Sequence, residues 1–243
     1  MKGYLHSFES LAAVDGMGLR CAVFLAGCPL RCAYCHNPDT WAIAAGTETD
    51  AETLFRKIRR YKPYFKELGG VTFSGGEPLL QAAFIREIIP MLASEKIPYA
   101  IDTSGAVKLT DDVKFVLDHA QTVLLDLKFW DRESYLRYTG RPWDDTLAML
   151  EYLNKIGKST WIRTVTVPNV NDSEDCIERY LQTVKNYACV EKYELLAFHT
   201  MGFFKYRELG IENPLCNTPP LDQDRKKALQ AFADRRLAEL REQ

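Results

Sequence analysis

The segment "FLAGCPLRCAYCHNPDTW", residues 24–41, contains three of the seven cysteines of this 243-residue chain. Cys28, Cys32 and Cys35 follow the spacing C-x₃-C-x₂-C, and no fourth cysteine lies nearby. Isolated cysteines are usually small buried hydrophobic residues, but a tight group of three indicates a metal centre. A structural zinc site needs four ligands, so His36 or a distant cysteine would have to complete it. In a [4Fe–4S] cluster each iron takes an external ligand, so three thiolates leave one iron open to a substrate or cofactor.

Composition and charge limit the class of protein. The formal net charge is −2, whereas a nucleic-acid binder would show a basic excess. The longest apolar run lies between Arg20 and Arg31 and is shorter than the roughly 18 residues that cross a membrane. The first ten residues lack the apolar stretch of a secretory signal. An odd number of cysteines, three of them clustered, is unlike a disulfide framework, so we expect a cytoplasmic protein without nucleic-acid or membrane partners.

Runs rich in β-branched and aromatic residues predict strands that alternate with helical patterns. The strands are expected at residues 20–26, 70–74, 98–103, 122–128, 160–167 and 192–198. Helices are expected after the capping residues Asp50, Thr110 and Ser173, over 84–92 with a kink at Pro90, over 147–156 before Gly157, and over 222–241.

This alternation implies right-handed βα units around a parallel sheet. Either a doubly wound open sheet or a (β/α) barrel fits the pattern. A full eight-unit barrel takes about 250 residues, so six units with long loops favour an incomplete one. We therefore expect an α/β fold, an incomplete (β/α)6 TIM-like barrel, in a single domain that spans residues 1–243.

Polar motifs follow the ends of these strands. The cysteine loop follows the first strand, "SGGEP" (74–78) ends the second, "DTSG" (102–105) the third and "DLK" (126–128) the fourth; Arg163 lies in the fifth, and "FHTMG" (198–202) follows the sixth. Carboxyl ends of parallel strands share one edge, where α/β folds bind their ligands. Charged residues in apolar strands are costly unless they are paired or directed into a polar site. The sequence therefore predicts a functional site at this edge, with a structural salt bridge as the alternative for its charged members.

The cysteine motif, with aromatic Tyr34 before its last cysteine, resembles the radical S-adenosylmethionine (SAM) superfamily. Within it, "VDGMGLR", "AGCPLRCAYCHNPDTW", "TFSGGEPLLQ", "IDTSG", "LLDLK" and "FHTMGFFKYRELG" resemble the activases of glycyl-radical enzymes, of the type that acts on pyruvate formate-lyase. The resemblance covers nearly the whole chain. It implies an oxidoreductase of anaerobic metabolism that cleaves SAM reductively at a [4Fe–4S] cluster. The resulting 5′-deoxyadenosyl radical would take a hydrogen atom from a glycine in a loop of the partner, and a flavodoxin-like protein would donate the electron.

The resemblance also implies roles for individual residues. Cys28, Cys32 and Cys35 would hold the cluster in the loop 28–35, and the amino and carboxylate groups of SAM would bind the open iron. The residues expected around SAM are Tyr34, His36, Asn37, Gly75, Gly76, Glu77, Asp102, Asp126, Lys128, Arg163 and His199. Asp102, Thr103 and Asp126 are further expected to bind a monovalent cation beside the SAM carboxylate.

The loop "DGMG", residues 15–18, departs from the pattern of the family, which commonly has D-G-P-G. With Met17 in place of proline a fixed φ angle is lost, so this loop is expected to be more mobile. The family implies that Asp15 and Arg20 lie near the incoming glycine segment of the partner, with Asp15 accepting a backbone hydrogen bond from it.

Four other functions fit parts of the sequence. A small-molecule radical SAM enzyme would use the same site. An activase of another glycyl-radical enzyme often carries an inserted ferredoxin-like segment with extra cysteines, whereas no cysteine lies between Cys35 and Gly75 here. A noncatalytic iron–sulfur electron carrier would be served better by a fully ligated cluster. A zinc-binding scaffold would contain zinc without iron and sulfide.

Overall fold

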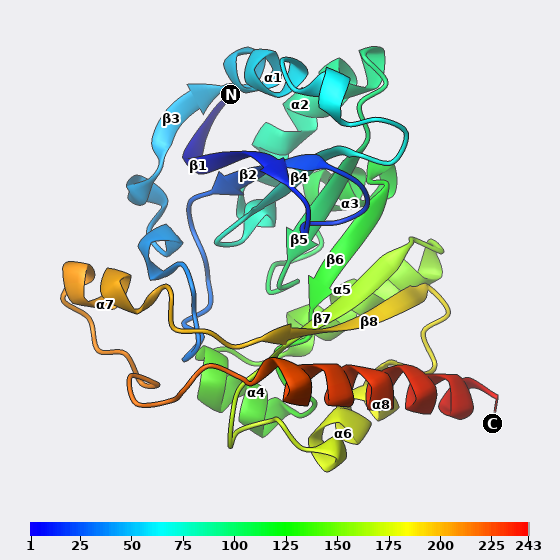
Figure 1. Cartoon of the computed structure of the whole chain (residues 1–243). Helices are drawn as coiled ribbons and strands as arrows, with labels where there is room; N and C mark the ends of the chain where they lie inside the picture. Colours follow the sequence, from blue (N-terminus) through cyan, green and yellow to red (C-terminus); the bar gives the residue numbers. More distant parts are fainter. Residues whose placement is uncertain (243) are drawn as a thin grey trace. The chain divides into compact units, whose positions relative to one another are not determined.

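The computed structural model describes residues 1–242 and contains two compact units. The first unit comprises Met1–Pro29 and Thr40–Leu124, and the second comprises Leu30–Asp39 and the residues from Leu125 on. Cys28 therefore belongs to the first unit, while Cys32 and Cys35 belong to the second. The division also falls within strand β6 (Thr122–Asp126), along which the chain leaves the first unit (Figure 1). The single domain expected from the sequence stays a prediction.

The first unit is built on five neighbouring strands in the order β3-β1-β2-β4-β5. They are β1 (Lys2–Ala12), β2 (Arg20–Leu25), β3 (Thr47–Asp50), β4 (Gly70–Gly75) and β5 (Tyr99–Thr103). β1 runs antiparallel to β2 and β3, whereas β2, β4 and β5 are parallel to one another. Almost every residue of β2 and β4 is buried, which explains why both strands read as continuous apolar runs.

Local signals begin and end the helices of the first unit, α1 (Ala51–Arg59), α2 (Ala82–Ser94) and α3 (Asp111–His119). The Asp50 carboxylate accepts a hydrogen bond from the Thr53 amide at 2.7 Å, and the Thr110 hydroxyl caps α3 in the same way. Both caps were predicted from the sequence. Pro90 lies inside α2, which continues to Ser94. α2 packs against both α1 and α3.

The second unit contains the parallel strands β7 (Thr160–Thr166) and β8 (Val190–Ala197). Its helices are α4 (Arg132–Thr139), α5 (Asp144–Lys155), α6 (Glu174–Val184), α7 (Phe203–Leu209) and α8 (Gln223–Arg241). α8 packs against β8 and α6 (Figure 1). Ser173 caps α6, and Gly157 follows α5 with a φ of +61°, as the sequence predicted.

The six predicted strands are confirmed, with ends that agree to within two residues. β1, β3, α4 and α7 were not predicted. β1 mixes polar and apolar residues, and most of its side chains are only partly buried or exposed, so it lacks the apolar run that marked the parallel strands. No helix among residues 1–242 combines the length and the apolar character that crossing a membrane requires.

The fully buried side chain of Asn171 generates a prediction about stability. Its Oδ1 accepts a hydrogen bond from the Val167 amide at 2.6 Å, and its Nδ2 donates to the Val165 carbonyl and the Tyr180 hydroxyl. Asn171→Ala removes all three bonds and should lower the free energy of unfolding by about 1–3 kcal/mol, because buried polar groups lose their partner. Urea unfolding measures this. The exposed Asn186 provides the control Asn186→Ala; equal stabilities of the two variants would contradict the assigned role.

Candidate active site

The chain that leads to Cys28 is held by the "SGGEP" motif in the first unit. The amides of Gly76 and Glu77 donate to the carbonyls of Leu25 and Gly27, at 2.9 and 2.8 Å. A Cβ atom at Gly76 would lie 2.3 Å from the Gly27 oxygen and 3.0 Å from Cys28 Cβ. The glycine is therefore required for close packing against the cysteine loop. A protonated amino group only donates hydrogen bonds, so at this strand end it would be held by carbonyl oxygens and not by these amides.

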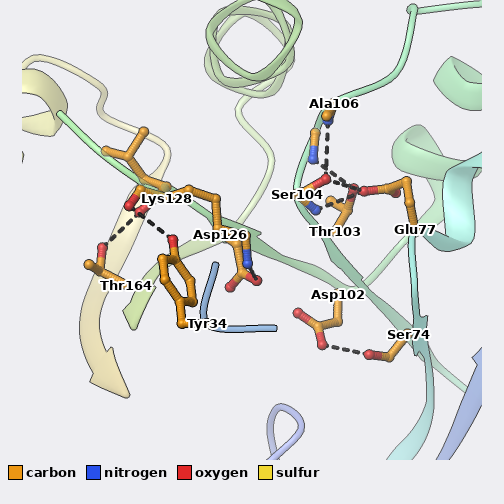
Figure 2. Close-up of polar contacts among 12 residues, drawn as sticks. Tyr34, Ser74, Glu77, Asp102, Thr103, Ser104, Ala106, Asp126, Lys128 and Thr164 are labelled. Carbon is orange, nitrogen blue, oxygen red and sulfur yellow. Dashed lines mark hydrogen bonds and ion pairs between the residues drawn. The ribbon is translucent and has the colours of Figure 1, made fainter. Parts of the chain in front are cut away.

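Glu77 is a fully buried carboxylate that joins two of the predicted motifs. Its Oε1 accepts hydrogen bonds from the Thr103 hydroxyl at 2.6 Å and the Leu79 amide at 3.1 Å. Its Oε2 accepts from the hydroxyl and the amide of Ser104, at 2.6 and 2.9 Å (Figure 2). Burial raises the pKa of Glu77, and these hydrogen bonds oppose the rise. Glu77 thus supports the strand ends from within the protein.

The predicted cation ligands of the first unit already make contacts within the protein. Asp102 Oδ2 accepts a hydrogen bond from the Ser74 hydroxyl at 2.7 Å (Figure 2). The Thr103 hydroxyl donates to Glu77 and accepts from the Gly105 amide at 2.9 Å. The monovalent cation beside Asp102, Thr103 and Asp126 stays a prediction.

In the second unit, main-chain contacts fix the segment that carries Cys32 and Cys35. The amides of Arg31 and Ala33 donate to the carbonyls of Thr139 and Tyr138, at the end of α4, at 2.7 and 2.8 Å. The Cys35 amide donates to the Cys32 carbonyl at 3.0 Å, which closes a tight turn. Cys32 is buried and Cys35 half-buried. These contacts hold two of the three predicted cluster ligands on a defined loop.

Lys128 acts at this loop through both its carbonyl and its ammonium group. The carbonyl accepts hydrogen bonds from the hydroxyls of Tyr34 and Tyr180, at 3.2 and 2.9 Å. The ammonium pairs with Asp126 Oδ2 at 2.5 Å (Figure 2). Burial acts to lower the pKa of Lys128, but Asp126 and Cys32 outweigh it, and the pKa is raised. The structural salt bridge considered from the sequence is therefore present between Asp126 and Lys128.

Two histidines of the second unit lie against each other. The rings of His36 and His199 are 3.5 Å apart between centroids, in an edge-to-face arrangement. Burial lowers the pKa of His36 to about 4, with further lowering by His199 and Lys205. Burial also lowers the pKa of His199. Both imidazoles are therefore neutral near pH 7.

The remaining predicted SAM contacts of the second unit lie on β7 and beside the cysteine loop. The Arg163 carbonyl accepts the amide of Leu127, which joins β7 to the end of the "DLK" motif. Asn37 Oδ1 accepts a hydrogen bond from Lys205 Nζ at 2.7 Å. Tyr34 is buried, and its hydroxyl is directed to Lys128. Its predicted contact with adenine stays a prediction.

Buried polar atoms of this unit fit a polar cofactor. Asp126 Oδ1, His36 Nε2 and His199 Nδ1 are buried and have no hydrogen-bond partner within the described part of the chain. Buried polar groups are almost always paired, so such atoms indicate a polar ligand that completes them. SAM offers an ammonium group, a carboxylate, ribose hydroxyls and an adenine. The donor set therefore fits SAM, and the three thiols fit a [4Fe–4S] cluster.

The predicted partner loop lies at the opposite end of β2 from the cysteine loop. Arg20 is fully buried; its Nη1 donates to the Met17 carbonyl at 2.8 Å and its Nε donates to the Thr72 hydroxyl. That hydroxyl donates in turn to the Asp15 carbonyl at 2.6 Å. The Arg20 side chain thus bonds the main chain of this loop from the protein interior and is not exposed at the surface. The predicted approach of the glycine segment to Asp15 and Arg20 stays a prediction.

Zinc finds no support in the geometry. Among residues 1–242, no three His, Cys, Asp or Glu side chains are grouped so that they could hold a single ion. A [4Fe–4S] cluster makes a different demand, because each thiolate binds a separate iron.

Comparison with known proteins defines the class. Residues 23–180 match the family model of the radical SAM superfamily. A pyruvate formate-lyase-activating enzyme of Clostridium pasteurianum is 44% identical over 234 residues, which cover 95% of this chain and 96% of the relative. One of Staphylococcus epidermidis is 39% identical and covers 93% of both chains. The chain therefore belongs to the radical SAM superfamily and, within it, to the family of pyruvate formate-lyase-activating enzymes.

Solved structures with low identity show the same fold. A domain of a pyruvate-formate lyase-activating enzyme from Bacteroides vulgatus aligns with a TM-score of 0.56 and 21% identity, covering 69% of this chain and 94% of that one. Streptococcus suis SuiB bound to S-adenosylmethionine aligns with a TM-score of 0.66 and 18% identity, over 87% of this chain and 45% of that one. The predicted fold class, an incomplete (β/α)6 barrel of the radical SAM type with an open parallel sheet, is confirmed.

Several residues of the site were missed by sequence reasoning. Ser74 and Ser104 lie inside quoted motifs, and their hydroxyls bond the predicted acidic residues. Lys205 and Tyr206 of α7 bond the cysteine segment, although "FHTMGFFKYRELG" had served only to identify the family. Tyr180 gave no signal beyond its place in an apolar helical stripe.

The contacts of Glu77 predict a specific effect of Glu77→Gln. The amide nitrogen of the glutamine would replace one carboxylate oxygen. As a donor it cannot accept the two hydrogen bonds that this oxygen now accepts. The variant should lose about 1–3 kcal/mol of stability, because two donors become unsatisfied, and it should bind SAM more weakly as the strand ends separate. Thermal unfolding and SAM titration of the reconstituted protein measure both effects. Glu67→Gln, at an exposed position, is the control. A Glu77→Gln variant as stable as this control would contradict the role of Glu77 in holding the two motifs together.

Proposed function

We propose that this chain activates pyruvate formate-lyase by generating a glycyl radical on it. The observation that carries the proposal is full-length similarity to pyruvate formate-lyase-activating enzymes, together with a cysteine triad on a loop whose main chain is fixed. When bound, the [4Fe–4S] cluster and SAM supply one-electron reductive cleavage and, through it, hydrogen abstraction from carbon.

The cysteines hold the cluster in this proposal. Cys28, Cys32 and Cys35 would each hold one iron of the cluster, and the remaining iron would be open to the amino and carboxylate groups of SAM. Main-chain hydrogen bonds support this role. In the first unit the Cys28 amide donates to the Trp41 carbonyl, and in the second the amides of Arg31 and Ala33 donate to the carbonyls of Thr139 and Tyr138.

The surrounding side chains hold SAM and exclude water. Asp126 and Lys128 form a partly buried ion pair, and the second carboxylate oxygen of Asp126 remains available to a cofactor. The neutral imidazoles of His36 and His199 offer nitrogen atoms to the nucleoside. Asn37, Gly75, Gly76, Glu77, Asp102, Arg163 and Tyr34 complete the proposed set, with Glu77 acting through the motifs that it joins.

The glycine of the partner suits this chemistry. Glycine has no side chain that blocks approach to its Cα, and the radical formed there is delocalised over the neighbouring amides. Arg20 and Thr72 fix the carbonyls of Met17 and Asp15 in the loop 15–18. The approach of the glycine segment to this loop stays a prediction.

The rival functions are less well supported. No cysteine lies between Cys35 and Gly75, where activases of other glycyl-radical enzymes often carry a ferredoxin-like segment with extra cysteines. A small-molecule enzyme or an activase of another glycyl-radical enzyme would require the partner specificity of this chain to differ from that of its relatives. A simple electron carrier would not need the unpaired buried atoms that fit SAM.

We further infer a cytosolic location and a low-potential electron donor of the flavodoxin type. All seven cysteines lie within residues 1–242, and none is joined in a disulfide. Such thiols fit a reducing compartment.

The proposal is tested by activation without oxygen. The reconstituted and reduced protein is mixed with SAM and pyruvate formate-lyase, and an electron paramagnetic resonance spectrum is recorded. We expect a glycyl signal and 5′-deoxyadenosine in matching amounts. Cys32→Ala should abolish both, whereas Cys216→Ala, at an exposed position outside the motif, should retain them.

Two outcomes would contradict the proposal differently. Ample 5′-deoxyadenosine without a glycyl signal would exclude pyruvate formate-lyase as partner and leave the radical SAM chemistry intact. Full activity of Cys32→Ala would overturn the assignment of the cluster ligands.

A further inference from the structure

Helix α7 and the glycine just before it contact the cysteine segment at three positions, 202, 205 and 206. The Tyr206 hydroxyl donates to the Cys35 carbonyl at 2.9 Å. Lys205 Nζ donates to Asn37 Oδ1 at 2.7 Å and pairs with the Asp39 carboxylate at 3.0 Å. At Gly202, just before the helix, a Cβ atom would lie 2.4 Å from the His36 oxygen. The segment 35–39 is therefore bonded or closely packed along its length by residues 202–206.

These contacts are partly buried, so they constrain the loop more than fully exposed bonds would. Tyr206 is 2% exposed, and the side chains of Lys205 and Asp39 are 20% and 28% exposed. Burial raises the pKa of Tyr206, and the neighbouring Cys35 and Cys32 add to the rise. Dissolved salt weakens a partly buried ion pair, such as that of Lys205 and Asp39, less than it weakens an exposed one.

α4 and α7 bond different parts of the segment. α4 bonds the part before Cys35 through the amides of Arg31 and Ala33, and the Lys128 carbonyl receives the Tyr34 hydroxyl. From Cys35 onward, the Cys35 carbonyl, Asn37 and Asp39 receive side-chain hydrogen bonds from α7. Loss of these bonds would loosen the third ligand together with the adjacent His36 and Asn37.

We propose that α7 is a positioning helix, in which Lys205 and Tyr206 set the placement of Cys35 and of the neighbouring SAM-binding residues. The inference rests on the proposed function and deepens it, since it assigns roles to residues that bond the segment carrying Cys35. Groups that orient metal ligands from behind typically change metal affinity or activity by about 10- to 100-fold when removed.

The helix also explains part of its own sequence. Gly202 is required by the close approach to His36, and Gly210 ends the helix with a φ of +64°. Lys205 and Tyr206 point toward the loop, whereas Arg207 and Glu208 are exposed. The helix therefore offers matched pairs of residues that do and do not reach the site.

The test compares variants of the reconstituted full chain. Tyr206→Phe removes only the hydroxyl that reaches Cys35, and Lys205→Met removes the ammonium while keeping the length of the side chain. Both should lose iron to a chelator roughly 10-fold faster than the parent protein, and both should change the electron paramagnetic resonance spectrum of the reduced cluster with SAM. Lys205→Met should also raise the KM for SAM more than it lowers kcat, because Asn37 is displaced.

Two controls separate positioning from general destabilisation. Arg207→Met removes a cation from the exposed face of the same helix and should leave iron retention and the spectrum unchanged. Lys205→Arg keeps a cation that can bond Asn37 and Asp39, and should restore most of the retention. Circular dichroism and thermal unfolding of each variant report whether the fold is intact.

The outcomes are distinguishable from failure of the proposed function. If the parent protein binds no cluster, the radical SAM assignment itself fails. If the parent retains its cluster and Tyr206→Phe and Lys205→Met match Arg207→Met in iron loss, spectrum and KM, the positioning role is refuted.

Discussion

The structure depends on holding three thiols on a loop that has almost no regular structure of its own. A [4Fe–4S] cluster with three protein ligands requires that they stay in place while the fourth iron exchanges partners. The loop meets this demand through its main chain: Cys28 bonds Trp41, Arg31 and Ala33 bond the end of α4, and the Cys35 carbonyl receives Tyr206. Within each unit these bonds come from well-packed strands and helices. The main chain that carries the cysteines is therefore held as firmly as those elements.

A second constraint is the satisfaction of buried polar groups at the strand ends. Glu77 and the Lys128 carbonyl each collect several donors, and each joins segments that are distant in sequence. A buried acceptor of this kind destabilises the protein if only some of its hydrogen bonds are made. The polar atoms left over, on Asp126, His36 and His199, are those that a cofactor would complete. Glu77 and the Lys128 carbonyl, whose hydrogen bonds are made within the protein, therefore belong to the framework of the site. Asp126, His36 and His199, which keep polar atoms without a partner, are the residues proposed to contact SAM.

Local signals in the sequence predicted much of this fold, and long-range contacts escaped it. Asp50, Thr110 and Ser173 bond amides within their own helices, so their roles follow from spacing alone. The cysteine motif and the strand-end motifs were likewise recognisable because their residue types are unusual. By contrast, Glu77 meets Ser104 across 27 positions and Lys205 meets Asn37 across 168, and no periodicity reveals such pairs. β1 escaped because a strand with exposed and half-buried side chains gives no clear alternation.

The central claim is that one iron of the cluster is not ligated by the protein and receives SAM. Mössbauer spectroscopy of protein reconstituted with ⁵⁷Fe tests it directly, because it resolves the four irons by their ligand environment. On addition of SAM, one iron in four should acquire a distinct signal with a larger isomer shift, while the other three are unchanged. Four irons that remain equivalent and insensitive to SAM would contradict it.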